Sequence, residues 1–453
     1  MPIDAAIHGA PMHRESPVDH HFSTGRLPSP VSLPPSLPTT VMTLSRRMVI
    51  AVALVLMVMV ALVIRDRRRA DTSAYATSSV AVSIMPVAYS ASEMRDRDIE
   101  FYTRRAAQDR ESAADRAALA ALHLARGSAT GATTDLDRAE QLARESIQRR
   151  TARNGQAFEL LATALMARHA FREARTVMQR ADSLAPDTPS HLALLGEIEL
   201  ELGEYEAAKS RFTAIHFDGE QFTIGARLAR WYELTGHVDI ARQFLTRAIR
   251  RVALRDDLPR PQVAWFHYRL GELELRVGQH AAADSAFRAS LAINHDDARA
   301  LGGLARVAAA QKRWSDAITY GAEATAVQLD PATIGTMSVA YAALGDSVQS
   351  ESFARAMAVS ALRQPGAIHR AWGLFLLDHG TVVDRREVLR RARRELSERH
   401  DVYGHDLLAW ALFRNGRVTE ARSQMAIALS QQTEDVLLTA HALAIGIGAP
   451  QTR

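Results

Sequence analysis

A pair made of a bulky residue and a small residue recurs through most of this chain at intervals close to 34 residues. The small members of successive pairs are separated by 34, 33, 42, 34, 33, 35 and 36 positions. The pairs are Leu161-Ala162, Leu195-Gly196, Leu228-Ala229, Leu270-Gly271, Leu304-Ala305, Met337-Ser338, the looser Trp372-Gly373, and Leu408-Ala409. A period of about 20 to 50 residues indicates a stack of similar units, none of which buries its apolar face alone.

Three further positions keep the same register within each unit. Seven residues after the small residue comes a turn residue: Gly203, Gly236, Gly278, Gly345, Gly380 or Gly416, with His169 and Lys312 in two units. Twelve residues after the small residue comes a second one: Ala174, Ala208, Ala241, Ala283, Ala317 or Ala421. A bulky residue then follows at Met178, Phe212, Leu245, Phe287 and Met425. This order predicts two helices joined by a tight turn, with small residues where the helices approach and large ones filling the gaps.

In this spacing the chain resembles the tetratricopeptide-repeat family over residues 115 to about 430. The stretch DLLAWALFRNGR (406–417) also resembles a bacterial subgroup with a D-x-LAWAL-x-x-x-G-R signature. The resemblance implies an all-α superhelical solenoid of helix–turn–helix units, about eight or nine of them. It implies no catalytic activity and no cofactor.

Composition divides the chain into four predicted parts. Residues 1–41 hold half of the prolines and predict a disordered tail, residues 42–69 a transmembrane anchor, and residues 70–91 a linker. Residues 92–453 form the predicted repeat solenoid, with a capping helix in 95–110 and another after 430. The stretch GSATGATT (127–134) is expected to be a long turn.

The anchor prediction depends on residues 48–64, which are 17 apolar residues between Arg46-Arg47 and RDRRR (65–69). Such a run is just long enough to cross a bilayer if the flanking arginines reach the interfaces. A cleaved signal peptide is the alternative, but RDRRR stands where the cleavage site would lie. The prediction is a single-pass protein of the bacterial cytoplasmic membrane. The side of the repeat domain stays open, because four arginines follow the segment and two precede it. Translation from Met42 or Met48 instead of Met1 also stays open.

Charge and cysteine content exclude several classes of function. The chain has a net charge of +4 and no cysteine, so thiolate metal sites, catalytic thiols and disulfides are absent. Basic residues interleave with acidic ones, as in RARRELSERHD (391–401), and this pattern argues against a nucleic-acid-binding face.

No phosphate loop, zinc-protease motif or nucleophile elbow occurs, so no catalytic residue, cofactor or metal ligand is predicted. The best metal-like group is His400, Asp401, His405 and Asp406, but its ligand set is incomplete. Asp378-His379 has no accompanying nucleophile and is interpreted as part of a helix end.

A partner-binding groove is the remaining functional prediction. By analogy with the family, seven residues are expected to face the concave surface: Arg230, Trp265, Tyr268, Glu272, Arg306, Tyr403 and Trp410. Arginine and aromatic anchors of this kind suit recognition of a protein or peptide partner. The Lys/Asn/Arg set of the chaperone-tail clamp is missing, so that ligand is not implied.

The predicted function is therefore a membrane-anchored scaffold that binds a protein through its concave face, with no nucleic-acid partner. Two alternatives remain: a structural component of the cell envelope that self-associates, and a metal-dependent hydrolase that uses residues 400–410.

Overall fold

The computed structural model describes residues 90–217, 219–362, 370–397 and 399–448 of the chain. They belong to one compact unit, Ala88–Arg453. The preceding unit, Met1–Val87, lies outside the described residues, and with it the predicted tail and anchor. Of the helices in the described part, none is long and apolar enough to cross a membrane.

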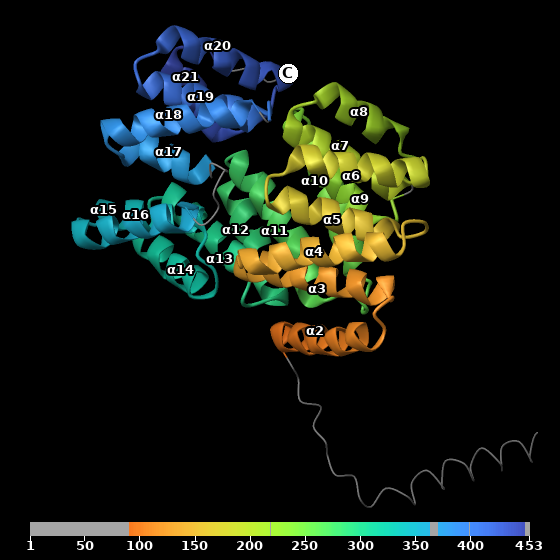
Figure 1. Ribbon diagram of the computed structural model, residues 1–453. Coiled ribbons are helices and arrows are strands. Elements are labelled where there is room, and N and C mark those ends of the chain that lie inside the picture. Colours follow the sequence, from red (N-terminus) through yellow and green to blue (C-terminus); the bar gives the residue numbers. More distant parts are fainter. Residues whose placement is uncertain (1–89, 218, 363–369, 398, 449–453) are drawn as a thin grey trace, which may run out of the picture. The chain divides into compact units, whose positions relative to one another are not determined.

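The described residues are helical throughout and contain no strand, so the prediction of an all-α repeat fold is confirmed. In the described part of the chain, nine hairpins stack in chain order, and neighbouring hairpins lie side by side (Figure 1). We call the first helix of each hairpin helix A and the second helix B. The hairpins are α3 (Ala113–Thr130) with α4 (Thr133–Arg149), α5 (Gly155–Ala167) with α6 (Phe171–Leu184), α7 (Pro189–Leu202) with α8 (Tyr205–Ala214), α9 (Phe222–Leu234) with α10 (Val238–Val252), α11 (Arg260–Arg276) with α12 (His280–Ile293), α13 (Ala298–Ala310) with α14 (Trp314–Val327), α15 (Pro331–Ala343) with α16 (Ser347–Leu362), α17 (Arg370–His379) with α18 (Val382–Leu396), and α19 (Val402–Arg414) with α20 (Val418–Ala428).

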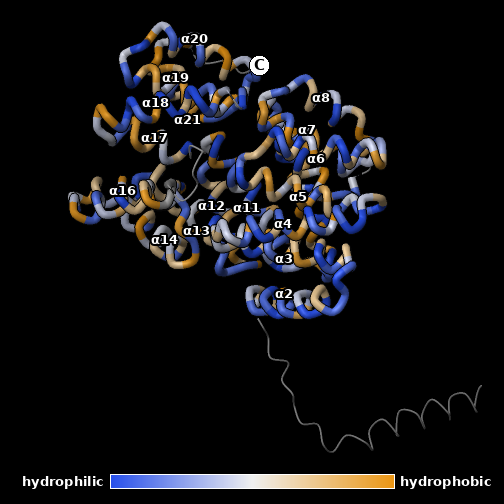
Figure 2. The backbone as a smooth tube through the Cα atoms, viewed as in Figure 1, coloured by the Kyte–Doolittle hydropathy of each residue, from blue (hydrophilic) through white to orange (hydrophobic). Residues whose placement is uncertain are grey.

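One helix covers each end of the stack. Helix α2 (Ala91–Gln108) packs on α3 and starts with a capping box between Ser90 and Glu93. Helix α21 (Val436–Ile445) packs on α19 and α20. Figure 2 shows hydrophobic residues distributed along the helices and interleaved with hydrophilic ones, as stacking of amphipathic hairpins requires.

The small and large positions of the repeat pack as predicted. All six alanines at the second small position are fully buried, and so are Met178, Phe287 and Met425 at the bulky position. A Cβ atom at Gly196 would lie 2.8 Å from the ring of Phe212, so the glycine lets helix B approach helix A. Leu195, which is fully buried, and Gly196 are therefore both packing positions.

The turn position is defined by backbone conformation more than by glycine. Five of the six predicted turn glycines have positive φ, from 72° to 84°, and so do His169 (60°) and Lys312 (59°). Gly380 is the exception. There Thr381 and Asp384 form a capping box at the start of α18, which makes a different turn. The GSATGATT prediction was also wrong in extent: α3 continues to Thr130, and the turn consists of Gly131 and Ala132.

Hairpins far apart in sequence also touch. The backbone N–H of His400 donates to the carbonyl oxygen of Leu202 at 2.9 Å, and the N–H of Val402 donates to the hydroxyl of Tyr205 at 2.9 Å. The hydroxyl of Thr433 donates to the carbonyl oxygen of Leu234. The segment around α19 and α21 is thus bonded to the ends of α7 and α9 and to the start of α8, about 200 residues earlier. These bonds do not follow from a repeat that contacts its neighbours alone.

We expect Gly271→Ala to destabilise the protein by about 1–3 kcal/mol, because its Cβ would lie 2.5 Å from the fully buried ring of Phe287. The double variant with Phe287→Leu should lose less than the two single variants added together, since the smaller side chain removes the overlap. Urea denaturation measures all three. Gly225→Ala is the control: its Cβ would make ordinary 3.4 Å contact, so better helix propensity should leave stability equal or raise it by up to about 1 kcal/mol. Equal losses at Gly225 and Gly271 would contradict the packing account.

Candidate functional site

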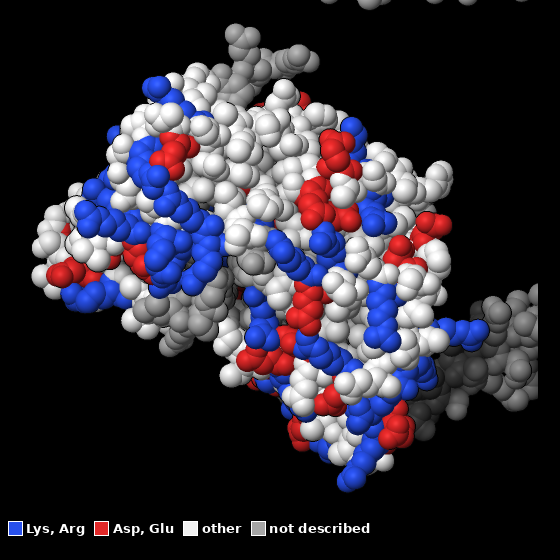
Figure 3. Space-filling model, turned by 45° about the horizontal axis from the view of Figure 1, so that its top comes forward, with Lys and Arg blue, Asp and Glu red and all other residues white. Residues whose placement is uncertain are grey.

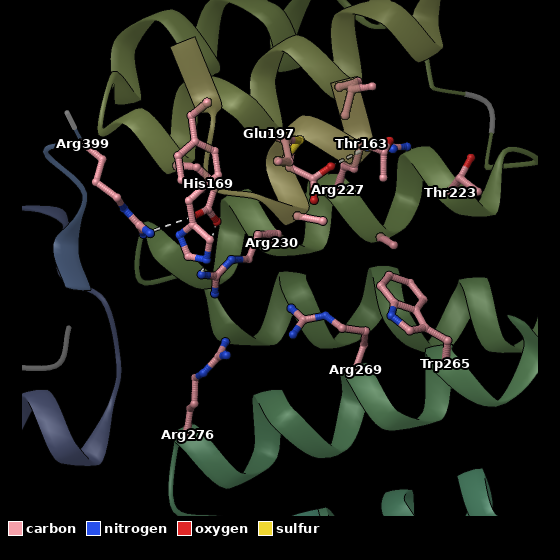
Figure 4. A pocket seen from close by; sticks show the side chains of 16 residues that line it. Thr163, His169, Glu197, Thr223, Arg227, Arg230, Trp265, Arg269, Arg276 and Arg399 are labelled. Atoms are coloured by element: carbon pink, nitrogen blue, oxygen red, sulfur yellow. Dashed lines mark hydrogen bonds and ion pairs between the residues drawn. The ribbon is translucent and has the colours of Figure 1, made fainter. Parts of the chain in front are cut away.

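A cavity opens on the A helices of four consecutive hairpins, α5, α7, α9 and α11 (Figure 4). Its volume is about 580 Å³, within the range of ligand-binding clefts. The polar side chains that line it are Thr163, His169, Glu197, Glu201, Thr223, Arg227, Arg230, Arg269, Arg276 and Arg399, and Trp265 is its largest apolar one. We call this site the arginine cavity.

Helical spacing places these side chains on one face. Glu197 and Glu201 are four residues apart on α7, and Arg227 and Arg230 are three apart on α9. Residues at these intervals lie above one another on a helix. Helix α7 packs beside both α5 and α9, so their polar faces form one wall, and Arg269 and Arg276 of α11 reach toward this wall and pair with Glu233 of α9.

Glu233 lies beneath this wall and organises three of the arginines. Its side chain is 3 % exposed, and its carboxylate lies 3.1 Å from Nη1 of Arg230 and 3.2 Å from Nη2 of Arg269. Arg276 also donates a hydrogen bond to it. Burial by itself would raise the pKa of Glu233, but Arg276, Arg230 and Arg269 outweigh burial and hold that pKa well below its ordinary value. The carboxylate is therefore the fixed counter-charge of the cavity.

Arg399 also lines the cavity, although it lies far along the chain from the four A helices. Its guanidinium contacts Glu201 at 3.1 Å and Asp401 at 2.7 Å, and its Cζ lies 5.2 Å from the centre of the Phe171 ring. Burial raises the pKa of Glu201, against the opposing effect of Arg399 and Arg230. The cavity therefore combines A helices of the early hairpins with the segment that precedes α19.

Arginine dominates the chemistry of the lining, with five guanidinium groups against the carboxylates of Glu197 and Glu201. Arg227 pairs with Glu197 at 2.7 Å. Arg230 lies within ion-pair distance of Glu233, yet its buried Nη1 makes no hydrogen bond of good geometry. Guanidinium groups bind carboxylates and phosphates through paired N–H donors, so the cavity suits an anionic group.

The structure divides the seven predicted groove residues among four places. Arg230 and Trp265 line the arginine cavity. Tyr268, Glu272 and Arg306 line a separate cavity of about 210 Å³, where Arg306 donates hydrogen bonds to the Glu272 carboxylate.

The remaining two lie further along the chain. Tyr403 lines a third cavity of about 90 Å³, and its ring is surrounded by the Cζ atoms of Arg370 (4.8 Å), Arg230 (5.6 Å) and Arg276 (5.8 Å). Trp410 is 8 % exposed, donates from Nε1 to Asp378 at 2.9 Å and stacks on His441. It is a packing residue of α19 in this structure.

Sequence reasoning missed Arg227, Glu233, Arg269 and Arg276, and it missed Arg399. The first four share a helix with a predicted residue at helical spacing, so a signal was present on α9 and α11. Nothing in the sequence pairs Arg399 with Glu201, because they are 198 positions apart.

The side chains of the metal-like stretch point to separate partners. Asp401 caps α19 and pairs with Arg399. His405 bonds Gln424 at 2.8 Å, and Asp406 bonds Arg370 at 2.6 Å and His441 at 2.7 Å. Among the described residues, no three His, Cys, Asp or Glu side chains gather as a metal site would require.

No protein-family model and no curated protein matches the chain. Solved structures resemble it in part. PilF of Pseudomonas aeruginosa has 15 % identity and a TM-score of 0.37 over 49 % of this chain and 97 % of its own. A tetratricopeptide repeat protein from Parabacteroides merdae has 13 % identity and a TM-score of 0.38 over 57 % and 98 %. The human IFIT1 dimer has 14 % identity and a TM-score of 0.46 over 71 % and 72 %. These likenesses are partial, so the repeat rests on the packing of its own helices.

Proposed function

We propose that this chain is a helical-repeat scaffold that binds an acidic segment of a partner protein in the arginine cavity. The carrying observation is that two consecutive A helices, α9 and α11, together with Arg399 bring five guanidinium groups and Trp265 to one open cavity, which α5 and α7 complete. Carboxylates of the partner would bind the arginines, and an apolar side chain would contact Trp265. The volume of about 580 Å³ accommodates a few side chains of an extended peptide.

Site-specific photocrosslinking in cells tests this proposal. A photoreactive amino acid replaces Thr223, which lines the cavity, and in a matched strain it replaces Thr319, an exposed threonine on helix B of another hairpin. We expect a protein to crosslink at position 223 and not at 319. Crosslinking to no protein at 223, or to the same proteins at both positions, would contradict the proposed function.

Charge reversal in the cavity supplies the quantitative prediction. Arg227→Glu should lower crosslinking at position 223 about tenfold or more, because it places a carboxylate beside Glu197 where the partner's own carboxylate would bind. The control is Arg247→Glu, the same change at an exposed site on α10, and it should leave crosslinking unchanged. The amount of crosslinked partner, normalised to the amount of scaffold, is the measurement.

The proposal includes a membrane anchor at residues 48–64, which lie outside the described residues. The support is the uncharged apolar run with arginines on both sides. Alkaline extraction of membranes tests the anchor, and release of the full chain by alkali would contradict it. A topology reporter fused after Arg453 then shows which side of the membrane the repeats occupy.

A further inference from the structure

Helix α18 concentrates basic charge in a way that the interleaved sequence conceals. It carries six arginines, Arg385, Arg386, Arg390, Arg391, Arg393 and Arg394, against three carboxylates, Asp384, Glu387 and Glu395. Six minus three leaves +3 on 15 residues of a chain whose total is +4. The expectation that interleaving prevents a basic face was therefore wrong for this helix.

The packing of α18 decides which side of it faces outward. Val388, Leu389 and Ala392 are buried in the core. The side chains of Arg386, Arg390, Arg393 and Arg394 are consequently exposed on the opposite side. Figure 3 shows basic side chains gathered into a broad patch on one face, with few acidic ones among them.

Two arginines of this outer face have no partner among the described residues. Glu387 pairs with Arg390 and Arg391, and Glu420 lies 3.4 Å from Arg393. Arg386 and Arg394 are exposed and make no side-chain bond to another described residue. Their guanidinium groups are therefore available to an external anion.

Exposed apolar side chains border the same surface. Val382 and Val383, in the first turn of α18, are 57 % and 73 % exposed. The outer surface of a nucleic-acid duplex is lined by charged phosphates and offers no continuous apolar layer to these valines. A lipid surface offers phosphate groups to arginines and an apolar layer directly beneath to valines.

We propose that the outer face of α18 is a docking surface for an anionic lipid bilayer. Arg386, Arg390 and Arg394 contact the headgroup phosphates, and Val383 reaches the boundary with the acyl chains. This surface is distinct from the arginine cavity, and the proposal depends neither on the partner bound there nor on the predicted anchor at 48–64.

The absence of cysteine from the natural chain allows a clean test. Val383→Cys is labelled in the full chain with an environment-sensitive fluorophore, and the chain is combined with nanodiscs of phosphatidylcholine alone or with phosphatidylglycerol. Controls carry the label at Val348 (72 % exposed, on α16) or Leu254 (78 % exposed, after α10). With the label at position 383 and discs that contain phosphatidylglycerol, we expect the fluorophore's emission to shift to the blue and its quenching by iodide to fall about threefold or more. High salt should reverse both changes, and neither should occur at the control positions or in discs of phosphatidylcholine alone.

Charge reversal separates this surface from general attraction to an anionic bilayer. Arg386→Glu with Arg394→Glu should abolish the change at position 383, while Arg247→Glu with Arg250→Glu, an equal change in net charge on α10, should preserve it. An unchanged signal at 383 in anionic discs, or equal signals at 348 and 254, would overturn the proposal. So would a signal at 383 produced by polyglutamate or DNA but not by the discs. Circular dichroism of each variant checks that it is folded.

Discussion

Replacing Glu233 with glutamine will destabilise the protein by about 3–5 kcal/mol at neutral pH, the range expected when one member of a buried ion-pair network is removed. The replacement keeps the shape of the side chain but removes the negative charge that faces Arg230, Arg269 and Arg276. Because Glu233 is 3 % exposed, water cannot take its place as a partner. Urea denaturation followed by circular dichroism measures the loss.

The pH dependence distinguishes lost charge from lost packing. The pKa of Glu233 is lower in the folded chain than in the unfolded chain, where it is about 4.3. Its stabilising contribution is therefore complete above the unfolded pKa and is lost as the pH falls toward the folded one. The difference between the natural chain and Glu233→Gln should be largest near neutrality and shrink below about pH 4.

Glu197→Gln is the matched control, because Glu197 lies in the same cavity, is 30 % exposed, and among the described residues forms an ion pair with Arg227 alone. We expect it to cost at most about 1 kcal/mol, as partly exposed ion pairs do. Equal effects of the two variants would show that Glu233 is not the central counter-charge of the cavity.

Gly203→Ala will have the second large effect, since it combines backbone strain with a collision that backbone atoms cannot avoid. Gly203 has φ 82°, where a side chain costs about 1–2 kcal/mol. An added Cβ would also lie 2.3 Å from the carbonyl carbon and oxygen of His400. We expect a total loss of about 3 kcal/mol or more and release of the segment before α19 from α7.

Gly416→Ala is the control for strain, because Gly416 has φ 77° and open space around it. It should lose about 1–2 kcal/mol and leave the contact with α7 intact. Hydrogen exchange reads this contact directly, since the His400 amide donates to the Leu202 carbonyl. We expect the His400 amide to exchange faster in Gly203→Ala and not in Gly416→Ala. Equal exchange in both variants would mean that the contact between the segment before α19 and α7 does not depend on the close approach at Gly203.

An alanine substitution at Gly236 tests a second contact of this kind, because its Cβ would lie 2.4 Å from the carbonyl oxygen of Gln432. Two turns of the repeat thus serve a second role as docking points for the C-terminal hairpins. If the arginine cavity requires Arg399, then opening these contacts should also weaken crosslinking at Thr223.

Parts of the candidate site were within reach of sequence reasoning. Arg230 and Trp265 were predicted from their place on helix A, and they do line the arginine cavity. Trp410 held the same kind of position, but the structure buries it against Asp378 and His441. Position within a repeat predicts which face a residue takes, and it cannot show whether another hairpin covers that face.

By itself, the sequence determined the hairpin, its length and its interior. The small and large residues of the repeat pack against residues 12 to 34 positions away in the sequence. Contacts at that separation follow from helical periodicity and steric fit. Gly196 against Phe212 is an example, and so is the left-handed turn that persists at His169 and Lys312 without glycine.

Only the tertiary structure decided which distant hairpins contact each other, and that these contacts bring Arg399 into the arginine cavity. Small rotations between successive hairpins accumulate until residues near 400 and 433 reach α7 and α9. No local pattern encodes that sum, so the pairing of Arg399 with Glu201 was invisible in the sequence. The basic outer face of α18 was hidden for a related reason: its charges alternate along the chain, and burial of Val388, Leu389 and Ala392 selects which of them meet the solvent.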